Sequence, residues 1–380
     1  MKKRTLFLTL VIVITFTAGV FTGMMVNQER QTSENSSVKN APKSAKKPNQ
    51  KQVPKYITDQ EKVLIGYVQD FRDPNMIDYP NLTHVIFSFA HPTKDGKLLL
   101  NGDSALNNLR NIVSKAHKHN TKVMLAIGGW FHIEGGESYE YFSEAITDSS
   151  SRTKLVNELI SFTERENLDG IDIDFEHPRS KADAENLTTF TKELSDKLHQ
   201  RNKELSIAVN AKIHSVAGTE INNVIYEPSM FQYVDHVNIM AYDGHWDGEY
   251  DAANLSPYPF NKNIVNYWAS LFDKHGLSKE KLVLGVPFYA QPENPDINQV
   301  SYAAIIQNNP ENANRDTVNM NGTTYHYNGE ETVRKKTKLA LDHGFGGMML
   351  WEAGHDANGP KSLTIAISRA LKDADKVVYN

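Results

Sequence analysis

The sequence predicts an α/β protein built on a (β/α)8 TIM barrel, preceded by an N-terminal hydrophobic segment and a linker. Beyond residue 60, short runs of β-branched residues alternate with segments whose apolar residues recur every three or four positions. The first pattern is typical of strands and the second of amphipathic helices, and their alternation predicts a parallel sheet. Eight such units over about 315 residues fit a closed barrel with some long loops. An open, doubly wound sheet is the alternative, but no glycine-rich phosphate loop follows the first strand.

Residues 1–26 have the order of a secretory signal, in which basic residues precede an apolar stretch. Lys2, Lys3 and Arg4 stand before an uncharged stretch at residues 6–26, which is long enough for a membrane-spanning helix. No clear cleavage site is present, so a cleaved signal peptide and a retained membrane anchor both stay open. Either one predicts that the rest of the chain is secreted or lies at the cell surface.

Residues 27–56 predict a flexible polar linker. They are rich in Ser, Asn, Gln, Lys and Pro, and they contain no aromatic residue before Tyr56, the last residue of the segment. Such a segment cannot bury enough apolar area to offset the entropy lost on ordering. Its basic residues allow association with an anionic membrane or cell wall, and a solvated spacer is the alternative.

The barrel domain is predicted for residues 57–380. The predicted strands are 62–69, 84–90, 122–129, 170–176, 205–211, 236–243, 282–289 and 346–352. The predicted helices are 103–119, 152–166, 184–201, 263–275, 330–343 and 362–374. In such a barrel, catalytic groups gather at the carboxyl ends of the strands.

The composition limits the function classes. The chain has 380 residues, with 41 Lys and Arg against 46 Asp and Glu, and a formal net charge of −5. Without strong basicity, nucleic acid is not an expected partner. Cysteine is absent, which excludes disulfides, thiolate metal sites and thiol catalysis.

Three carboxyl groups alternate along the fourth predicted strand. Asp172, Asp174 and Glu176 are separated by apolar residues at 171, 173 and 175. Because side chains alternate faces along a strand, the acids point one way and the apolar residues the other. A parallel barrel covers both faces of its strands, so a solvated acidic face is not expected, and the three acids should line the interior.

Crowded carboxyl groups in such an interior cannot all ionise. At least one pKa should therefore rise, and the three groups should titrate as a coupled set. Glu176 is the outermost of the three and can reach a substrate, so it is the candidate general acid. Asp172 and Asp174 behind it can share or pass charge.

Residues 169–176 (DGIDIDFE) resemble the DxxDxDxE signature of glycoside hydrolase family 18, the chitinases and endo-N-acetylglucosaminidases. Three further segments are similar to motifs of the same family and occur in the same order. They are AIGGW at 126–130, which resembles SxGG; MAYD at 240–243, which matches MxYD; and Trp351 after 346–350. The resemblance covers about residues 61–376 and implies that residues 57–380 form a glycoside hydrolase domain.

The resemblance also implies a mechanism without an enzyme nucleophile, metal or cofactor. Glu176 would protonate the glycosidic oxygen while the 2-acetamido oxygen of the substrate attacks the anomeric carbon, an exception to the two-carboxylate scheme. Asp174 would hold the acetamido N–H, and Tyr242 its carbonyl. Asp243 would contact the sugar, and Trp351 would form the floor beneath it.

Six more residues near strand ends are candidates for binding the substrate: Tyr67, Phe89, Gly129, Trp130, Met240 and Tyr289. Phe89, Trp130 and Tyr289 could equally pack the barrel rim, and Gly129 could serve only a bend in the chain. No HExxH or similar ligand spacing appears, so no metal site is predicted.

The sequence departs from the family pattern at Ala126, where the family usually has Ser bonded to the inner aspartate, here Asp172. Tyr67 could still serve that aspartate, so we expect a shifted rather than an abolished activity. Residues 292–329 are too short for the full α+β insertion of long-groove members. A shallower groove and internal cleavage of a polymer are therefore expected.

Three functions are compatible with these motifs. The first is a chitinase acting on β-1,4-linked N-acetylglucosamine polymers or oligomers, which the intact MxYD motif favours. The second is an endo-β-N-acetylglucosaminidase acting on glycoprotein glycans or peptidoglycan. The third is a non-catalytic chitin-binding lectin, although such members typically lack the acid that Glu176 supplies here. A monomer is expected in each case.

Overall fold

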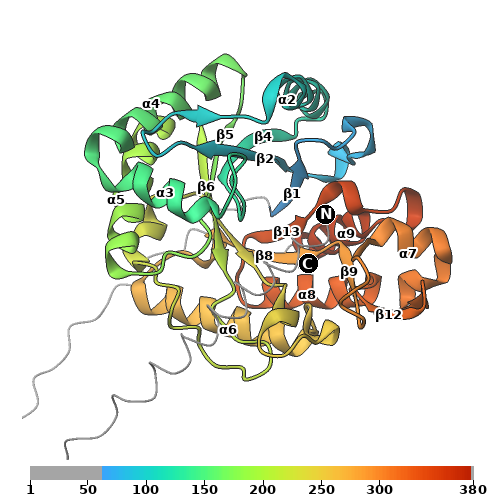
Figure 1. Ribbon diagram of the computed structural model, residues 1–380. Coiled ribbons are helices and arrows are strands. Elements are labelled where there is room, and N and C mark those ends of the chain that lie inside the picture. The colour runs from blue at the N-terminus through green and yellow to red at the C-terminus, as the bar shows by residue number, and fades with distance from the viewer. Residues whose placement is uncertain (1–61, 378–380) are drawn as a thin grey trace, which may run out of the picture. The chain divides into compact units, whose positions relative to one another are not determined.

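The computed structural model describes residues 62–377 (Figure 1). The predicted signal or anchor at 1–26 and the predicted linker at 27–56 lie outside these residues. Among the helices of the described residues, none combines the length and the hydropathy that crossing a bilayer requires.

Eight parallel strands close into the predicted barrel (Figure 1). The strands are β1 (Val63–Gln69), β2 (His84–Pro92), β4 (Lys122–Gly128), β5 (Gly170–Asp174), β6 (Glu204–Asn210), β7 (His236–Met240), β8 (Leu282–Pro287) and β13 (Gly347–Trp351). β1 pairs with β2 on one side and with β13 on the other, which closes the cylinder. The predicted fold class is confirmed. β5 and β7 end earlier than predicted, so Glu176 and Tyr242 lie just beyond their strands.

Helices surround the barrel and cover the outward faces of its strands (Figure 1). They are α2 (Gly102–Ala116), α3 (Ser138–Thr147), α4 (Ser149–Arg165), α5 (Lys181–His199), α6 (Tyr258–His275), α8 (Glu330–Asp342) and α9 (Leu363–Val377). The sequence pattern did not predict α3. Its apolar stripe holds only Phe142, Ala145 and Ile146, too few for a clear helical period.

A small antiparallel sheet lies between β8 and α8. It is formed by β9 (Tyr289–Pro292), β10 (Val300–Ser301), β11 (Thr317–Met320) and β12 (Thr323–His326), with α7 (Tyr302–Asn308) between β10 and β11. The strand order is β10-β9-β12-β11. A further short strand, β3 (Leu98–Leu99), pairs antiparallel with the end of β2. The segment that was predicted to be too short for a full insertion therefore forms a reduced α+β unit of two- to four-residue strands.

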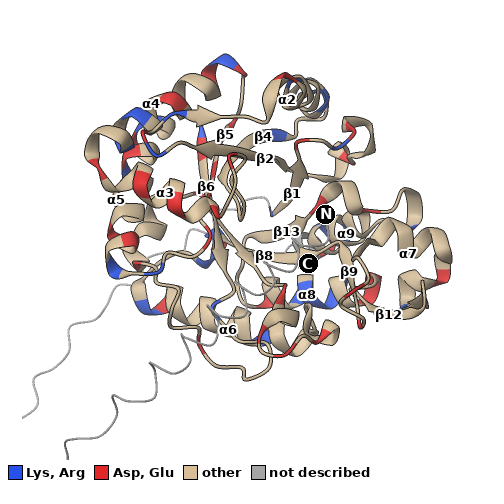
Figure 2. Cartoon of the chain, viewed as in Figure 1, with Lys and Arg blue, Asp and Glu red and all other residues tan. Residues whose placement is uncertain are grey.

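The outer helices carry charges of both signs. In the view of Figure 2, basic and acidic residues are interspersed along α4 and α5. Some of them pair between these two helices, as Arg152 does with Glu193 at 3.0 Å. This pair lies between the two helices, with the Arg152 side chain only 11% exposed. Exposed pairs such as Lys192–Asp196 of α5 contribute little to stability. The apolar faces of the same helices pack against the barrel.

Two separate apolar clusters result from the alternation of side chains along the strands. One lies between the barrel and the helices and includes Ile171, Ile173 and Phe175 of the β5 region. The other fills the inside of the barrel and includes Ile86 and Met124. Some inward residues at the carboxyl ends of the strands are polar, as Asp174 and Asn210 are, and others are aromatic or apolar, as Trp351 and Met240 are. At the amino ends, His84, Glu204 and His236 are polar. The barrel interior therefore has two polar ends with apolar side chains between them.

The aromatic residues that pack behind β5 should contribute strongly to stability. Phe142 is fully buried, and its ring centroid lies 4.9 Å from that of Phe175 and 5.7 Å from that of Phe190. Phe142→Ala should lower the free energy of unfolding by about 3–5 kcal/mol, because it leaves a cavity in a packed core. Phe71→Ala, at a ring that is 67% exposed, should change it by less than about 0.5 kcal/mol. Urea unfolding of both variants measures the difference, and equal effects would contradict the packing described.

Candidate active site

Strand β5 directs its three acids into the barrel. Ile171, Ile173 and Phe175 belong to the cluster that faces the helices, so the alternating acids face the other way. Asp172 and Asp174 are buried within the strand, and Glu176 is largely buried just beyond it. The predicted orientation of the three carboxyl groups is confirmed.

Asp172 is the innermost acid and is fully buried. Its carboxyl group accepts hydrogen bonds from the Tyr67 hydroxyl at 2.8 Å, the Ser206 hydroxyl at 2.5 Å and the Asn238 amide at 3.2 Å. Burial raises the pKa of Asp172 to about 6, and the three donors hold it below the value that burial alone would give. The predicted contact between Tyr67 and Asp172 is present.

Ser206 supplies the hydroxyl donor to Asp172 that Ala126 lacks. Asp172 lies between these two residues in the sheet, with Ala126 opposite it on β4 and Ser206 opposite it on β6. The hydroxyl group that the family pattern places on β4 is therefore supplied from the other side of the same aspartate. Ser206 was not predicted, because the register of two strands 34 residues apart is not visible in the sequence.

Asp174 has the least favourable surroundings of the three acids. It is 3% exposed, and its Oδ1 has no hydrogen-bond partner among residues 62–377. Burial first, and then the negative charges of Glu176 and Asp172, raise the pKa of Asp174 well above its usual range. A buried acid without donors is stable only when it is protonated or when a ligand supplies the donor.

Glu176 borders the cleft and has a pKa near neutrality. Burial, followed by the nearby charge of Asp243, raises the pKa of Glu176 to about 7. Its Oε2 lies 4.0 Å from Nε2 of His177, whose ring contacts that of Trp130 at 5.5 Å between centroids. A carboxyl group in this range can donate a proton at neutral pH and take one back later.

Tyr242 and Asp243 follow the end of β7 and face the same cleft. Among the residues that the structure describes, the Tyr242 hydroxyl donates only to the sulfur of Met349, at 3.9 Å, so it is free to bind a ligand. Asp243 adopts a left-handed backbone conformation with φ 63° and accepts a short hydrogen bond from the Tyr289 hydroxyl. The Asp243 side chain is 54% exposed, and desolvation by the walls of the cleft raises its pKa, against the effect of that hydrogen bond.

These side chains border one cavity of about 830 Å³ at the carboxyl ends of the strands. The predicted residues that line it are Tyr67, Trp130, Asp174, Glu176, Met240, Tyr242, Asp243 and Trp351. A volume of this size holds an oligomer of a few rings rather than a single small molecule. The cleft therefore combines carboxyl groups, a free phenol hydroxyl and aromatic rings.

Four predicted site residues do not line the cavity. Asp172 lies beneath it, and Tyr289 is buried and holds Asp243. Phe89 supports Trp351 from behind, with ring centroids 5.7 Å apart and planes at 24°. Gly129 serves the backbone: its φ is 80°, its N–H donates to the carbonyl of Asp174, and a Cβ there would meet the Phe89 ring at 3.0 Å.

Several cavity residues were not predicted. They are Phe131 after β4, Ala211, Ile213 and Ile221 after β6, and Gly244, Trp246, Asp247 and Phe260 after β7, together with His177 and Ala208. Phe131 and Trp246 are 69% and 66% exposed, which is unusual for large aromatic side chains. They lie in loops and belong to no motif. The only feature of the sequence that could have indicated them is the presence of an aromatic residue shortly after a predicted strand.

The cleft itself offers no close set of metal ligands. Within residues 62–377, the only three His, Asp or Glu side chains placed to share a metal ion are His84, Glu204 and His236. Each is the first residue of its strand, so they lie at the opposite end of the barrel. The acids of the cleft are arranged for proton transfer and hydrogen bonding.

The fold and the site define the class of protein: a (β/α)8 barrel whose strand ends hold paired carboxyl groups beside aromatic platforms, as in glycosidases. The chain belongs to glycosyl hydrolases family 18, because the model of that family matches residues 56–356. The family expected from the motifs is confirmed.

Two relatives from one organism are named as probable chitinases. Probable chitinase 10 of Drosophila melanogaster is 27% identical over 79% of this chain, which spans 15% of that protein. Probable chitinase 2 of the same organism is 31% identical over 60% of this chain and 47% of its own length. The chain thus spans less than half of either relative.

Solved structures match over most of their length. The family 18 chitinase ChiB of Flavobacterium johnsoniae is 27% identical with a TM-score of 0.67, covering 83% of this chain and 95% of that one. A chitinase from Bacteroides thetaiotaomicron is 26% identical with a TM-score of 0.68, covering 83% and 98%. A chitinase-like agglutinin from Robinia pseudoacacia, 20% identical with a TM-score of 0.66 over 81% and 99%, shares the fold.

The hydroxyl groups beside Asp172 should set the pKa of its carboxyl group. Ser206→Ala removes the 2.5 Å donor to Asp172 and should raise the pKa of that carboxyl group by about one unit, since a hydrogen bond to a charged group contributes about 1.5–3 kcal/mol. Ala126→Ser should lower the same pKa, and the double variant should return it towards the wild-type value. Carboxyl ¹³C NMR titration of labelled aspartates measures all three. An unchanged pKa in both single variants would contradict the assigned role.

The raised pKa of Glu176 should make the stability of the protein depend on pH. Because the pKa of Glu176 is raised to about 7 on folding, the folded state holds its proton more tightly, and stability falls as pH rises from about 4.5 to 7. Glu176→Gln should match the wild type near pH 4 and exceed its unfolding free energy by about 2–3 kcal/mol at pH 8. Glu185→Gln, at an exposed ion pair with Lys181, should show no such trend. Urea unfolding from pH 4 to pH 8 measures this difference. A wild type whose free energy of unfolding rose with pH relative to that of Glu176→Gln would refute the account.

Proposed function

We propose that the protein is a retaining glycoside hydrolase that cleaves β-1,4-linked N-acetylglucosamine polymers or oligomers, as a chitinase does. The observation that carries the proposal is the pKa of Glu176, raised to about 7 in a cleft that it shares with Asp174, Tyr242 and Trp351. One acid poised near neutrality, with an unpaired acid behind it, fits substrate-assisted cleavage better than the two-carboxylate scheme.

The first step needs a proton donor and an internal nucleophile. Glu176 gives its proton to the glycosidic oxygen as the bond to the anomeric carbon breaks. The 2-acetamido oxygen of the substrate forms the new bond to that carbon, which yields an oxazolinium-like intermediate. Asp174 accepts a hydrogen bond from the acetamido N–H, and this contact gives the donor that its unpaired Oδ1 lacks.

The second step restores the enzyme. Glu176, now ionised, takes a proton from a water molecule that attacks the anomeric carbon, and the acetamido group leaves that carbon. Two displacements retain the configuration of the product. The Tyr242 hydroxyl, which has only a weak sulfur contact in the structure, binds the acetamido carbonyl and keeps it aligned for both steps.

Aromatic rings and Asp243 position the sugar. Trp351 lies at the end of β13, supported by Tyr67 at 5.6 Å and Phe89 at 5.7 Å between ring centroids. A ring held on two sides offers a rigid apolar floor for the sugar face. Asp243, fixed by Tyr289, is placed to accept a hydrogen bond from a sugar hydroxyl.

Two observations bear on the alternatives. The barrel is also the fold of a chitinase-like agglutinin, so the fold by itself does not separate an enzyme from a lectin, and Glu176 is what favours the enzyme. The names of the relatives favour chitin over glycoprotein glycans or peptidoglycan. The reduced unit between β8 and α8 supports internal cleavage, because it leaves less protein to close the groove.

The location outside the cytoplasm belongs to the same proposal. It is supported by the basic and apolar order of residues 1–26, which predicts a secreted or surface-held protein. The polar segment at 27–56 would then separate the barrel from a membrane or cell wall. Chitin and peptidoglycan are both outside the cytoplasm, so this location suits either substrate.

Cleavage of chitin oligomers should depend on Glu176. The full-length chain, incubated with labelled chitin oligomers, an N-glycoprotein and peptidoglycan, should cleave the chitin oligomers internally and release the β-anomer first. Glu176→Gln should reduce the rate at least about a hundredfold, because it removes the general acid. Glu185→Gln should not change it. The wild-type rate should fall above about pH 7, as Glu176 loses its proton.

The product profile decides between the alternatives. Cleavage of the glycoprotein or peptidoglycan instead of chitin would replace the proposed substrate with the second one. Binding of chitin oligomers without hydrolysis by the wild type would establish the lectin. Release of dimers alone from the ends of a polymer would overturn internal cleavage.

A further inference from the structure

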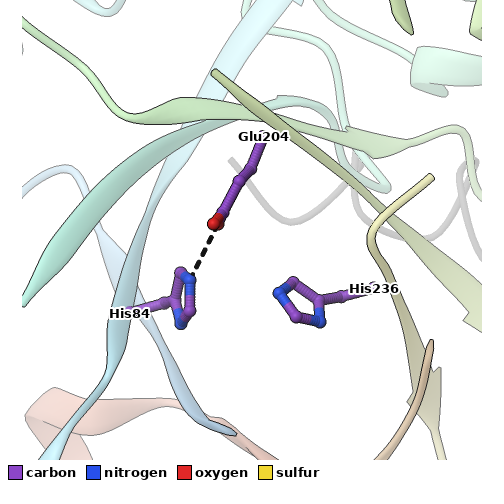
Figure 3. Close-up of side chains that lie close together, drawn as sticks. All are labelled: His84, Glu204 and His236. Atoms are coloured by element: carbon purple, nitrogen blue, oxygen red, sulfur yellow. Dashed lines mark hydrogen bonds and ion pairs between the residues drawn. The ribbon is translucent and has the colours of Figure 1, made fainter. Parts of the chain in front are cut away.

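Three side chains meet at the amino end of the barrel, far from the cleft (Figure 3). His84, Glu204 and His236 are the first residues of β2, β6 and β7, and they project inward from three walls of the cylinder. β2 and β6 are not neighbours, since β5 and β4 lie between them in the sheet. The three residues therefore meet across the barrel and not along one strand pair.

The ligand atoms of these residues lie close together. One nitrogen or oxygen atom from each falls within 4.8 Å of the other two. Nε2 of His84 is 2.9 Å from Oε2 of Glu204, and the two imidazole rings are 5.2 Å apart between centroids. Ligands of a tetrahedral zinc ion stand about 3.4 Å apart, so a shift of about 1 Å would bring the set onto one ion.

His236 is the member of the set whose ring contacts His84 without a hydrogen bond to any described residue. It is 5% exposed, and its Nδ1 is buried and unpaired among residues 62–377. In Figure 3 the other ring nitrogen faces His84 and Glu204. Leaving a buried imidazole without partners costs about 1–3 kcal/mol relative to a paired one, and hydrogen bonds among the described residues do not explain why it is aimed at the other two.

We propose that His84, Glu204 and His236 bind a divalent transition-metal ion, with zinc as the best fit. Two imidazoles and one carboxylate are a donor set that zinc takes in proteins, with the fourth position left to water. The absence of thiolates and the presence of imidazole favour zinc, nickel or cobalt over magnesium and calcium, which prefer oxygen ligands alone.

Neighbouring side chains support the set and also limit its affinity. Nδ1 of His84 contacts the Thr83 hydroxyl at 2.8 Å, which fixes the ring so that Nε2 faces the centre. Lys122, the first residue of β4, forms a short ion pair with Oε1 of Glu204 and leaves Oε2 to the metal. The positive charge of Lys122 repels a cation, so this lysine sets how tightly the ion is held.

The position indicates a structural role for the ion. Gly170 pairs with Glu204, and Asp174 comes four residues after Gly170, about 13 Å further along the sheet. An ion at this end cannot touch the substrate. It would tie opposite walls of the barrel together, which stabilises the folded state. The sequence predicted no metal because residues 84, 204 and 236 have no characteristic ligand spacing.

The test is metal binding by the untagged, full-length chain after treatment with a chelator. Calorimetric titration with Zn²⁺ should show one equivalent bound, and Co²⁺ should give the visible absorption of a tetrahedral site. Saturation with Zn²⁺ should raise Tm by about 5 °C at a hundredfold excess over Kd. His236→Gln and Glu204→Gln should each weaken binding at least about tenfold.

Two further variants keep the test decisive. Lys122→Gln should bind Zn²⁺ at least about threefold more tightly, because a competing charge is removed. His199→Gln changes a surface histidine that pairs with Asp235 and should bind like the wild type. Circular dichroism confirms folding of each variant. Failure of both the wild type and Lys122→Gln to bind, or wild-type affinity in a folded His236→Gln, would overturn the proposal.

Discussion

Desolvation of the carboxyl groups on β5 is the constraint on which the site depends. The same burial acts on each acid, but the partners differ. Asp172 has three donors, whereas Asp174 has an unpaired oxygen and negative charges on both sides. Glu176 stands at the edge of the cleft with Asp243 nearby. One strand thus produces three protonation environments, and only the outermost acid combines a pKa near neutrality with access to a substrate.

Burial of these acids requires support from both faces of the barrel wall. On the outer face, Phe175 packs against Phe142, so the chain that carries Glu176 is anchored in the helical layer. Along the wall itself, Gly128 has φ 118°, and a Cβ there would meet the carbonyl of Asp174 at 2.1 Å and the Phe142 ring at 3.2 Å. Glycine at that position allows the end of β4 to lie against the end of β5 and against this ring. The packing therefore maintains the raised pKa values.

Local patterns in the sequence predicted what depends on local periodicity. The alternation of 170–176 was enough to orient three acids and to place them inside a barrel, and the motifs were enough to identify the family. Ser206 was missed because its contact with Asp172 depends on the register of two strands. Phe131 and Trp246 were missed because loop conformation, which no periodicity encodes, brings them to the cavity. The histidines at 84 and 236 meet only because the sheet closes.

The two polar ends of the barrel are stabilised in opposite ways. Within the cleft, Asp174 and Glu176 are buried beside other carboxyl groups, so the folded protein favours their neutral forms. At the amino end, burial alone would raise the pKa of Glu204, but His84 and Lys122 outweigh it and lower that pKa to about 2, so this carboxylate is ionised. A barrel that keeps one end reactive benefits from an end held by ionic contacts. Strands that are tied at their first residues leave their last residues free to be selected for chemistry rather than for stability.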